Sequence, residues 1–101
     1  MMVALTGKQK QFLKGLAHPL SPVVRVGKGG VTESVIEETK KSLEIHELIK
    51  IRIDVEDSSD RRAMAAELAH AADALIAGGI GKIAILYRER KEEPGIKLPV
   101  S

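Results

Sequence analysis

Three segments carry apolar side chains three or four positions apart, the spacing of one face of an α-helix. They are residues 6–17, 33–46 and 60–77. In the first segment, Thr6 with Gln9 three positions later forms a capping-box pattern, and Thr32 is placed to cap the second. We expect the apolar face of the first helix, which includes Phe12, to be buried against a sheet.

Short β-branched or alternating runs between and after these helices predict strands. The runs are residues 23–26, 48–55 and 80–87. We expect Gly78 and Gly79 to form the C-cap of the third helix. We also expect residues 96–99, which follow a charged turn, to add a short edge strand. Crossover helices favour parallel pairing, and a last strand reached by a short turn pairs antiparallel. The predicted fold class is α/β, a small mixed four-stranded sheet with packed helices in the order α-β-α-β-α-β-β.

Length and composition narrow the class of protein. The 101 residues suit one domain, 1–101, with its own core. The chain has no cysteine, which excludes disulfides and thiol catalysis. No apolar run approaches the roughly 20 residues of a membrane span, and the first residues lack a secretory signal pattern. We therefore expect a cytoplasmic protein with no membrane partner, and we favour a monomer.

The small net charge of +2 conceals an uneven distribution. Residues 1–32 hold five basic groups and no acidic one, whereas residues 33–60 hold nine acidic and four basic groups. The five are Lys8, Lys10, Lys14, Arg25 and Lys28. Such asymmetry creates a local field that attracts an anionic partner to the first third of the chain. The alternative is a lysine-rich helix face that only aids solubility.

The segment Gly27-Lys28-Gly29-Gly30 joins a predicted strand to a predicted helix. Backbone N–H groups are unpaired at such a junction, and glycines let a ligand approach the backbone closely. No Ser or Thr follows Lys28, so this is not a Walker A loop, and the dinucleotide-binding G-x-G-x-x-G is absent. What remains is G-x-x-G, a clamp used on the RNA backbone. The alternative is a tight turn with no ligand.

Phe12 and Tyr87 are the only aromatic residues, too few for a base-stacking platform. We therefore expect contacts mainly with phosphates, 2′-hydroxyls and helical shape, with modest sequence specificity and strong salt dependence.

Several strings of the sequence resemble the YhbY-type proteins, which are single CRM domains (chloroplast RNA splicing and ribosome maturation). These strings are residues 5–14, 16–20, 27–30 and 46–50, within a resemblance that covers roughly residues 4 to 99. It implies a fold similar to the C-terminal domain of bacterial translation initiation factor three. It also implies binding to structured RNA and association with precursors of the large ribosomal subunit. The family's G-x-x-G loop falls on Gly27 to Gly30, and its basic first helix on Lys8, Lys10 and Lys14.

These observations predict a non-enzymatic RNA-binding protein with no cofactor, metal site or catalytic residue. Its RNA-binding residues are Lys8, Lys10, Lys14, Arg25, Gly27, Lys28, Gly29, Gly30 and Thr32. One alternative is a small phosphate- or nucleotide-binding regulator that uses the same glycine loop. Another is an adaptor whose acidic middle segment docks a basic protein.

Other polar residues favour less specific roles. The three histidines lack the spacing of metal ligands. The acidic cluster at residues 54–60 could hold Mg²⁺, but a solvated loop that caps a helix is the simpler expectation. Arg25, Lys82 and Arg88 could extend the basic surface, depending on which face of the sheet is open.

Overall fold

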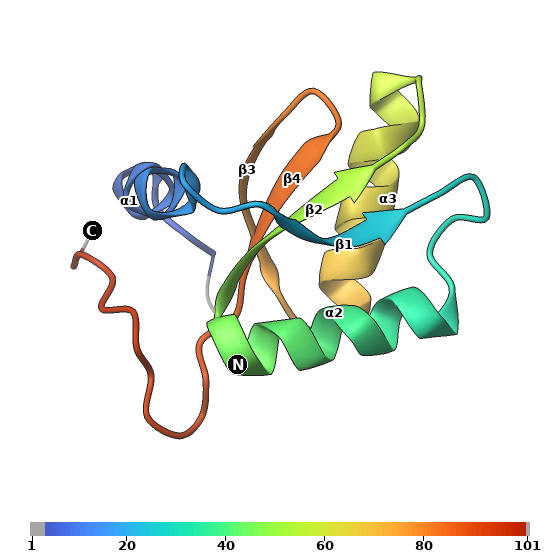
Figure 1. Cartoon of the computed structure of the whole chain (residues 1–101). Coiled ribbons are helices and arrows are strands. Elements are labelled where there is room, and N and C mark those ends of the chain that lie inside the picture. The colour runs from blue at the N-terminus through green and yellow to red at the C-terminus, as the bar shows by residue number, and fades with distance from the viewer. Residues whose placement is uncertain (1–3, 101) are drawn as a thin grey trace.

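The computed structural model describes residues 4–100 and contains a four-stranded sheet with helices on both faces (Figure 1). The elements are α1 (Gly7–Ala17), β1 (Pro22–Val26), α2 (Glu33–His46), β2 (Leu48–Ile53), α3 (Ser58–Ala71), β3 (Leu75–Ile80) and β4 (Ile83–Tyr87). The strand order is β1-β2-β4-β3, with β1 parallel to β2, and β4 antiparallel to both of its neighbours. The predicted fold class and the order α-β-α-β-α-β-β are therefore confirmed, although the last two strands occupy other residues than predicted.

The helices begin at side chains that accept backbone hydrogen bonds. Thr6 Oγ1 accepts from the N–H of Gln9 at 3.1 Å, and Gln9 Oε1 accepts from the N–H of Thr6 at 3.0 Å, which confirms the capping box. Thr32 Oγ1 accepts from the N–H of Val35 at 3.2 Å at the start of α2. At α3 the cap is Asp57, so this helix begins at Ser58, two residues before the predicted start.

The prediction for residues 72–79, the end of a helix and its glycine C-cap, is wrong. The third helix ends at Ala71 because the following backbone leaves helical geometry, with Asp73 at a φ of 56°. Residues 75–80 form β3, so Gly78 and Gly79 lie inside a strand and do not cap a helix. A strand is favoured here because it pairs along β4 and buries side chains on both faces of the sheet. The predicted strand at 80–87 instead contains the last residue of β3, the turn at residues 81–82, and β4.

The predicted edge strand at residues 96–99 is also wrong, since the structure has no strand there. The backbone N–H groups of Gly95 and Ile96 donate to the side chain of Glu47. The segment therefore has a side-chain partner in place of a neighbouring strand.

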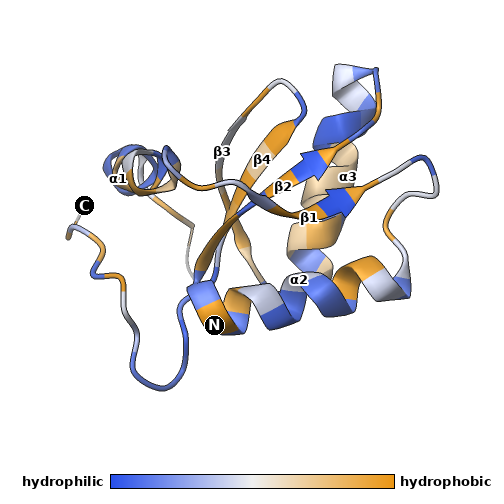
Figure 2. Ribbon diagram, viewed as in Figure 1, coloured by the Kyte–Doolittle hydropathy of each residue, from blue (hydrophilic) through white to orange (hydrophobic). Residues whose placement is uncertain are grey.

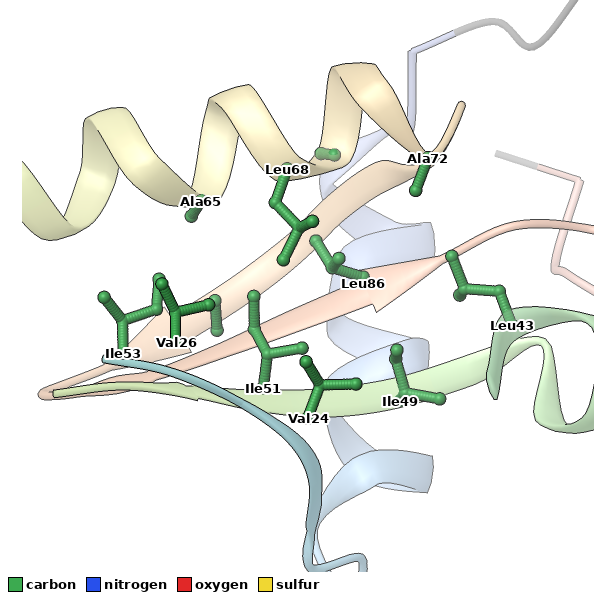
Figure 3. Packing of buried hydrophobic residues seen from close by; sticks show 12 residues of the cluster. Val24, Val26, Leu43, Ile49, Ile51, Ile53, Ala65, Leu68, Ala72 and Leu86 are labelled. Atoms are coloured by element: carbon green, nitrogen blue, oxygen red, sulfur yellow. The ribbon is translucent and has the colours of Figure 1, made fainter. Parts of the chain in front are cut away.

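The larger core lies between the sheet and helices α2 and α3, as Figure 3 shows. Its side chains come from alternate positions of the strands, such as Ile49, Ile51 and Ile53 of β2, and they meet Leu43 and Leu68 of the two helices. A smaller core lies beneath α1 on the opposite sheet face. It contains Leu13, Ala17, Leu48, Ala77, Ile85 and Tyr87. Within residues 4–100, no helix is long and apolar enough to cross a membrane.

Only a narrow stripe of α1 is buried. Leu13 and Ala17 are inaccessible, whereas Phe12, expected on the buried face, is 40% exposed, and Leu16 is 42% exposed. The expectation for Phe12 is wrong because α1 rests on the sheet along a single line of small and medium side chains. One partly exposed ring is still too little for a stacking platform.

Candidate nucleic-acid interface

The glycine loop follows β1 directly and leads into α2 (Figure 1). The N–H of Gly30 donates to the carbonyl of Gly27 at 3.0 Å, which closes a tight turn. Gly30 has a φ of +79°, a conformation that glycine adopts without the strain of a Cβ. Among residues 4–100, the N–H groups of Lys28 and Gly29 have no hydrogen-bond acceptor. The turn therefore presents free donors at its tip.

The loop is also sterically open. A Cβ added at Gly27, Gly29 or Gly30 would have no heavy atom within 4 Å beyond its chain neighbours. Lys28 is exposed, and its ammonium has no ion-pair partner in the part of the chain that the structure describes. A ligand can therefore reach the backbone and a free cation at the same place.

Thr32 has a structural role at this junction, since its hydroxyl caps α2. The start of a helix favours anions, but Glu33 lies in the first turn of α2 and opposes a second negative charge there. The attraction for an anion must therefore come mainly from Lys28 and the nearby Arg25.

Arg25 lies on the sheet face opposite the larger core, with its side chain 72% exposed. Its Nε is 3.3 Å from Asp54 Oδ2, and Arg52 Nε is 2.6 Å from Asp54 Oδ1. The hydrogen bond from Arg52 outweighs partial burial and, with the nearby positive charges, holds the pKa of Asp54 below its ordinary value. Asp54 is thus a stable carboxylate between two arginines.

Lys8, Lys10 and Lys14 are exposed on α1, which lies at the opposite end of β1 from the glycine loop in Figure 1. None of the three forms an ion pair with another described residue. The aliphatic part of the Lys14 side chain packs against Gly78 of β3, which restricts the conformations of this side chain. The structure thus places Arg25, Gly27–Gly30 and Thr32 together and the three lysines of α1 apart from them. One ligand can contact both groups only by crossing the sheet face between them.

The remaining basic candidates are engaged within the fold. Lys82 Nζ is 2.9 Å from Glu56 Oε1, and Arg88 donates to the carbonyl of Ala72 at 2.9 Å. Arg88 Nη2 also lies 3.6 Å from Glu44. These side chains therefore support the hairpin and the end of α3 more than they extend the loop surface.

Carboxylates of the acidic cluster at residues 54–60 also form contacts within the fold. Asp54 binds two arginines, Glu56 binds Lys82, and Asp57 caps α3 by accepting from Ser59 and Asp60. Across residues 4–100, no three His, Cys, Asp or Glu side chains gather as a metal site would require.

Sequence reasoning missed Glu47, whose side chain has a central role. It is 1% exposed and accepts from the backbone N–H groups of Arg90, Gly95 and Ile96 at 2.9, 2.6 and 3.0 Å. Burial opposes ionisation, but these hydrogen bonds and the charge of Arg90 prevail and lower the pKa of Glu47. No local pattern marks this residue, because its partners lie more than 40 positions away.

Sequence reasoning also missed Arg52 as a candidate contact. A signal was present, since Arg52 is a polar position of the alternating run in β2, on the side that faces solvent or a ligand. Figure 2 shows hydrophilic positions at the arrow ends of both β1 and β2, beside the glycine loop.

Comparison with known proteins identifies the family. The CRS1 / YhbY (CRM) domain model matches residues 5–88. "Probable RNA-binding protein YqeI" of Bacillus subtilis is 40% identical over 95 residues, covering 94% of this chain and 99% of that protein. An "RNA-binding protein" of Haemophilus influenzae is 43% identical over 98 residues, covering 97% of this chain and 98% of that protein.

The fold has a solved counterpart among such proteins. The solution structure of SAV1595 from Staphylococcus aureus is 39% identical and superposes with a TM-score of 0.84, covering 94% of this chain and 99% of that one. The family model, the relatives and the fold agree, and the chain belongs to the CRS1 / YhbY (CRM) domain family.

Proposed function

We propose that this protein is a non-enzymatic RNA-binding module that assists assembly of the large ribosomal subunit in the cytoplasm. It grips the RNA backbone with the glycine loop and with the basic side of α1. The observation that carries the proposal is the open turn at Gly27–Gly30, with free backbone donors around an unpaired Lys28.

The chemistry of the loop suits a phosphodiester. Glycines without a Cβ allow a phosphate oxygen to reach the N–H groups of Lys28 and Gly29. The Lys28 ammonium adds a mobile point charge that neutralises one phosphate. Such contacts read charge and shape and carry no base identity, which suits structured RNA.

The relatives support RNA as the partner, since those from Bacillus subtilis and Haemophilus influenzae are named RNA-binding proteins. The ribosomal target rests on the resemblance to YhbY-type proteins. The lysines of α1 add a second group of positive charges, which an extended polyanion can contact at the same time as the loop.

The test is binding of the full chain to fragments of large-subunit rRNA by fluorescence anisotropy over a range of salt concentrations. We expect Lys28→Glu and, separately, Gly29→Asp to weaken binding at least tenfold, with thermal unfolding unchanged. The matched control is Lys41→Glu, an exposed lysine about 13 Å along α2 from the cap, beyond the Debye length of ~10 Å.

Equal loss in Lys41→Glu and Lys28→Glu would mean that only overall charge matters and would overturn the site. Micromolar binding of ATP, GTP or a sugar phosphate in calorimetry, without binding of structured RNA, would favour a nucleotide-binding regulator. For the ribosomal target, crosslinking in cells followed by sequencing should recover precursor large-subunit rRNA, and its absence would overturn that part.

A further inference from the structure

Two arginines on adjacent strands share one carboxylate beside the glycine loop. Arg25 of β1 and Arg52 of β2 are partners in the register of the parallel pair. Both side chains lie on the sheet face opposite the larger core. Each bonds Asp54 through its Nε, Arg52 at 2.6 Å and Arg25 at 3.3 Å, so the carboxylate lies between the two guanidinium groups.

This arrangement leaves the outer ends of both guanidinium groups free. Neither Arg25 nor Arg52 makes a further hydrogen bond or ion pair with the residues that the structure describes. Their side chains are 72% and 40% exposed. A guanidinium fork matches the spacing of two phosphate oxygens, and two forks held close together match one phosphate better than either alone.

The pair adjoins the glycine loop through the backbone. The N–H of Asp54 donates to the carbonyl of Val26 at 2.8 Å, and Val26 directly precedes Gly27. The arginines therefore lie on the sheet face next to the loop, which is the face that a ligand must cross to reach α1.

We propose that Arg25 and Arg52 form a second phosphate site, for an RNA phosphodiester next to the one held by the glycine loop, with Asp54 as the positioning residue. The inference rests on the proposed function and deepens it. It assigns Arg52 and Asp54 to the interface and explains how one RNA contacts both the loop and the lysines of α1.

The competing interpretation is that Asp54 only neutralises the two arginines. The two interpretations predict opposite signs for Asp54→Asn, which raises the net charge by one. Pure neutralisation predicts tighter RNA binding in the variant. Positioning predicts weaker binding, on the order of threefold, because the two forks lose their fixed geometry.

The experiment measures RNA affinity against salt concentration for Arg25→Ala/Arg52→Ala and for the charge-matched control Lys41→Ala/Lys91→Ala. We expect the slope of log K against log salt to fall by about one for the arginine pair, which holds one phosphate, and to stay unchanged for the control. Unchanged slopes in both would overturn the site. The glycine loop is tested separately by Lys28→Glu, so the two failures are distinguishable.

A double-mutant cycle then tests the role of Asp54. Arg25→Lys/Arg52→Lys keeps the charge and removes the forks. We expect Asp54→Asn to weaken binding in the arginine background and to have no weakening effect in the lysine background. Tighter binding in both backgrounds would overturn the positioning role. Thermal unfolding of each variant checks that the fold is intact.

Discussion

Two glycine-rich segments of this chain have similar composition and different surroundings. Gly27–Gly30 contains a lysine, and Gly78–Gly81 is followed by one. At Gly27–Gly30, an added Cβ would meet nothing, and Lys28 has no partner among the described residues. In Gly78–Gly81, by contrast, a Cβ at Gly79 would lie 2.8 Å from the carbonyl oxygen of Ile83.

The lysines of the two segments, Lys28 and Lys82, also differ in whether they have an ion-pair partner among the described residues. Lys82 bonds Glu56 at 2.9 Å, which ties the hairpin turn to the loop before α3. The glycines at 78 and 79 allow close packing of the chain on itself, whereas those at 27–30 leave space for a ligand. The close contacts at Gly78 and Gly79 thus indicate a packing role for these two glycines, and no such packing role accounts for Gly27, Gly29 and Gly30.

The largest effect is expected for Gly79→Ala, since its new methyl group meets the backbone of β4. Overpacking of this kind costs about 1–3 kcal/mol in the free energy of unfolding. Urea denaturation measures the cost. A variant as stable as the wild type would show that β3 and β4 shift to accommodate the methyl group. Close packing at Gly79 would then not distinguish it from the glycines of residues 27–30.

Gly30→Ala should cost less, about 1 kcal/mol, because the methyl group has space but the backbone is held at a φ of +79°. The same denaturation experiment measures this cost. Gly27→Ala is the control, with equal space and no positive φ, and we expect its stability to stay within about 0.5 kcal/mol of the wild type.

Gly29→Ala extends the comparison of the two glycine-rich segments from stability to RNA affinity. We expect unchanged stability and a loss of RNA affinity of roughly threefold, because the methyl group keeps a phosphate from the turn. Anisotropy with an rRNA fragment measures the loss. Full affinity in this variant would indicate that RNA does not approach the backbone at this position.

The smallest expected effect is a change in the pKa of Glu56 when Lys82, but not Lys28, is replaced. The hydrogen bond from Lys82 lowers the pKa of Glu56, so Lys82→Ala should raise that pKa toward 4.5. A carboxyl with a lowered pKa stabilises the fold above its ordinary pKa, and this contribution is lost as pH falls through the folded value. Carboxyl carbon NMR across acidic pH measures the change, with Lys28→Ala as a control that leaves Glu56 unaffected.

Much of the fold could be predicted because its signals are local. Thr6, Thr32 and the alternating run of β2 each specify an element through neighbours within a few positions. The end of α3 could not be predicted, because alanine-rich sequence favours helix and the pairing of β3 with β4 decides otherwise. The tail after β4 depends on Glu47, a partner distant in the sequence.

The same limit applies to the candidate interface. The glycine loop is contiguous in the sequence, so Gly27, Lys28 and Gly29 could be named together. The pairing of Arg25 with Arg52 depends on strand register, which is a property of the folded sheet. The separation of α1 from the loop likewise follows from which sheet face each element covers.

The buried carboxylate of Glu47 makes particular demands on the segment from Arg90 to Ile96. It binds main-chain N–H groups, so changes of side chain at the exposed Lys91 and Glu92 leave its partners in place. Inserting or deleting one residue there would instead shift Gly95 and Ile96 out of reach. Length is therefore fixed in this turn while its charge is free to drift, and related chains could acquire different surfaces here without altering the sheet.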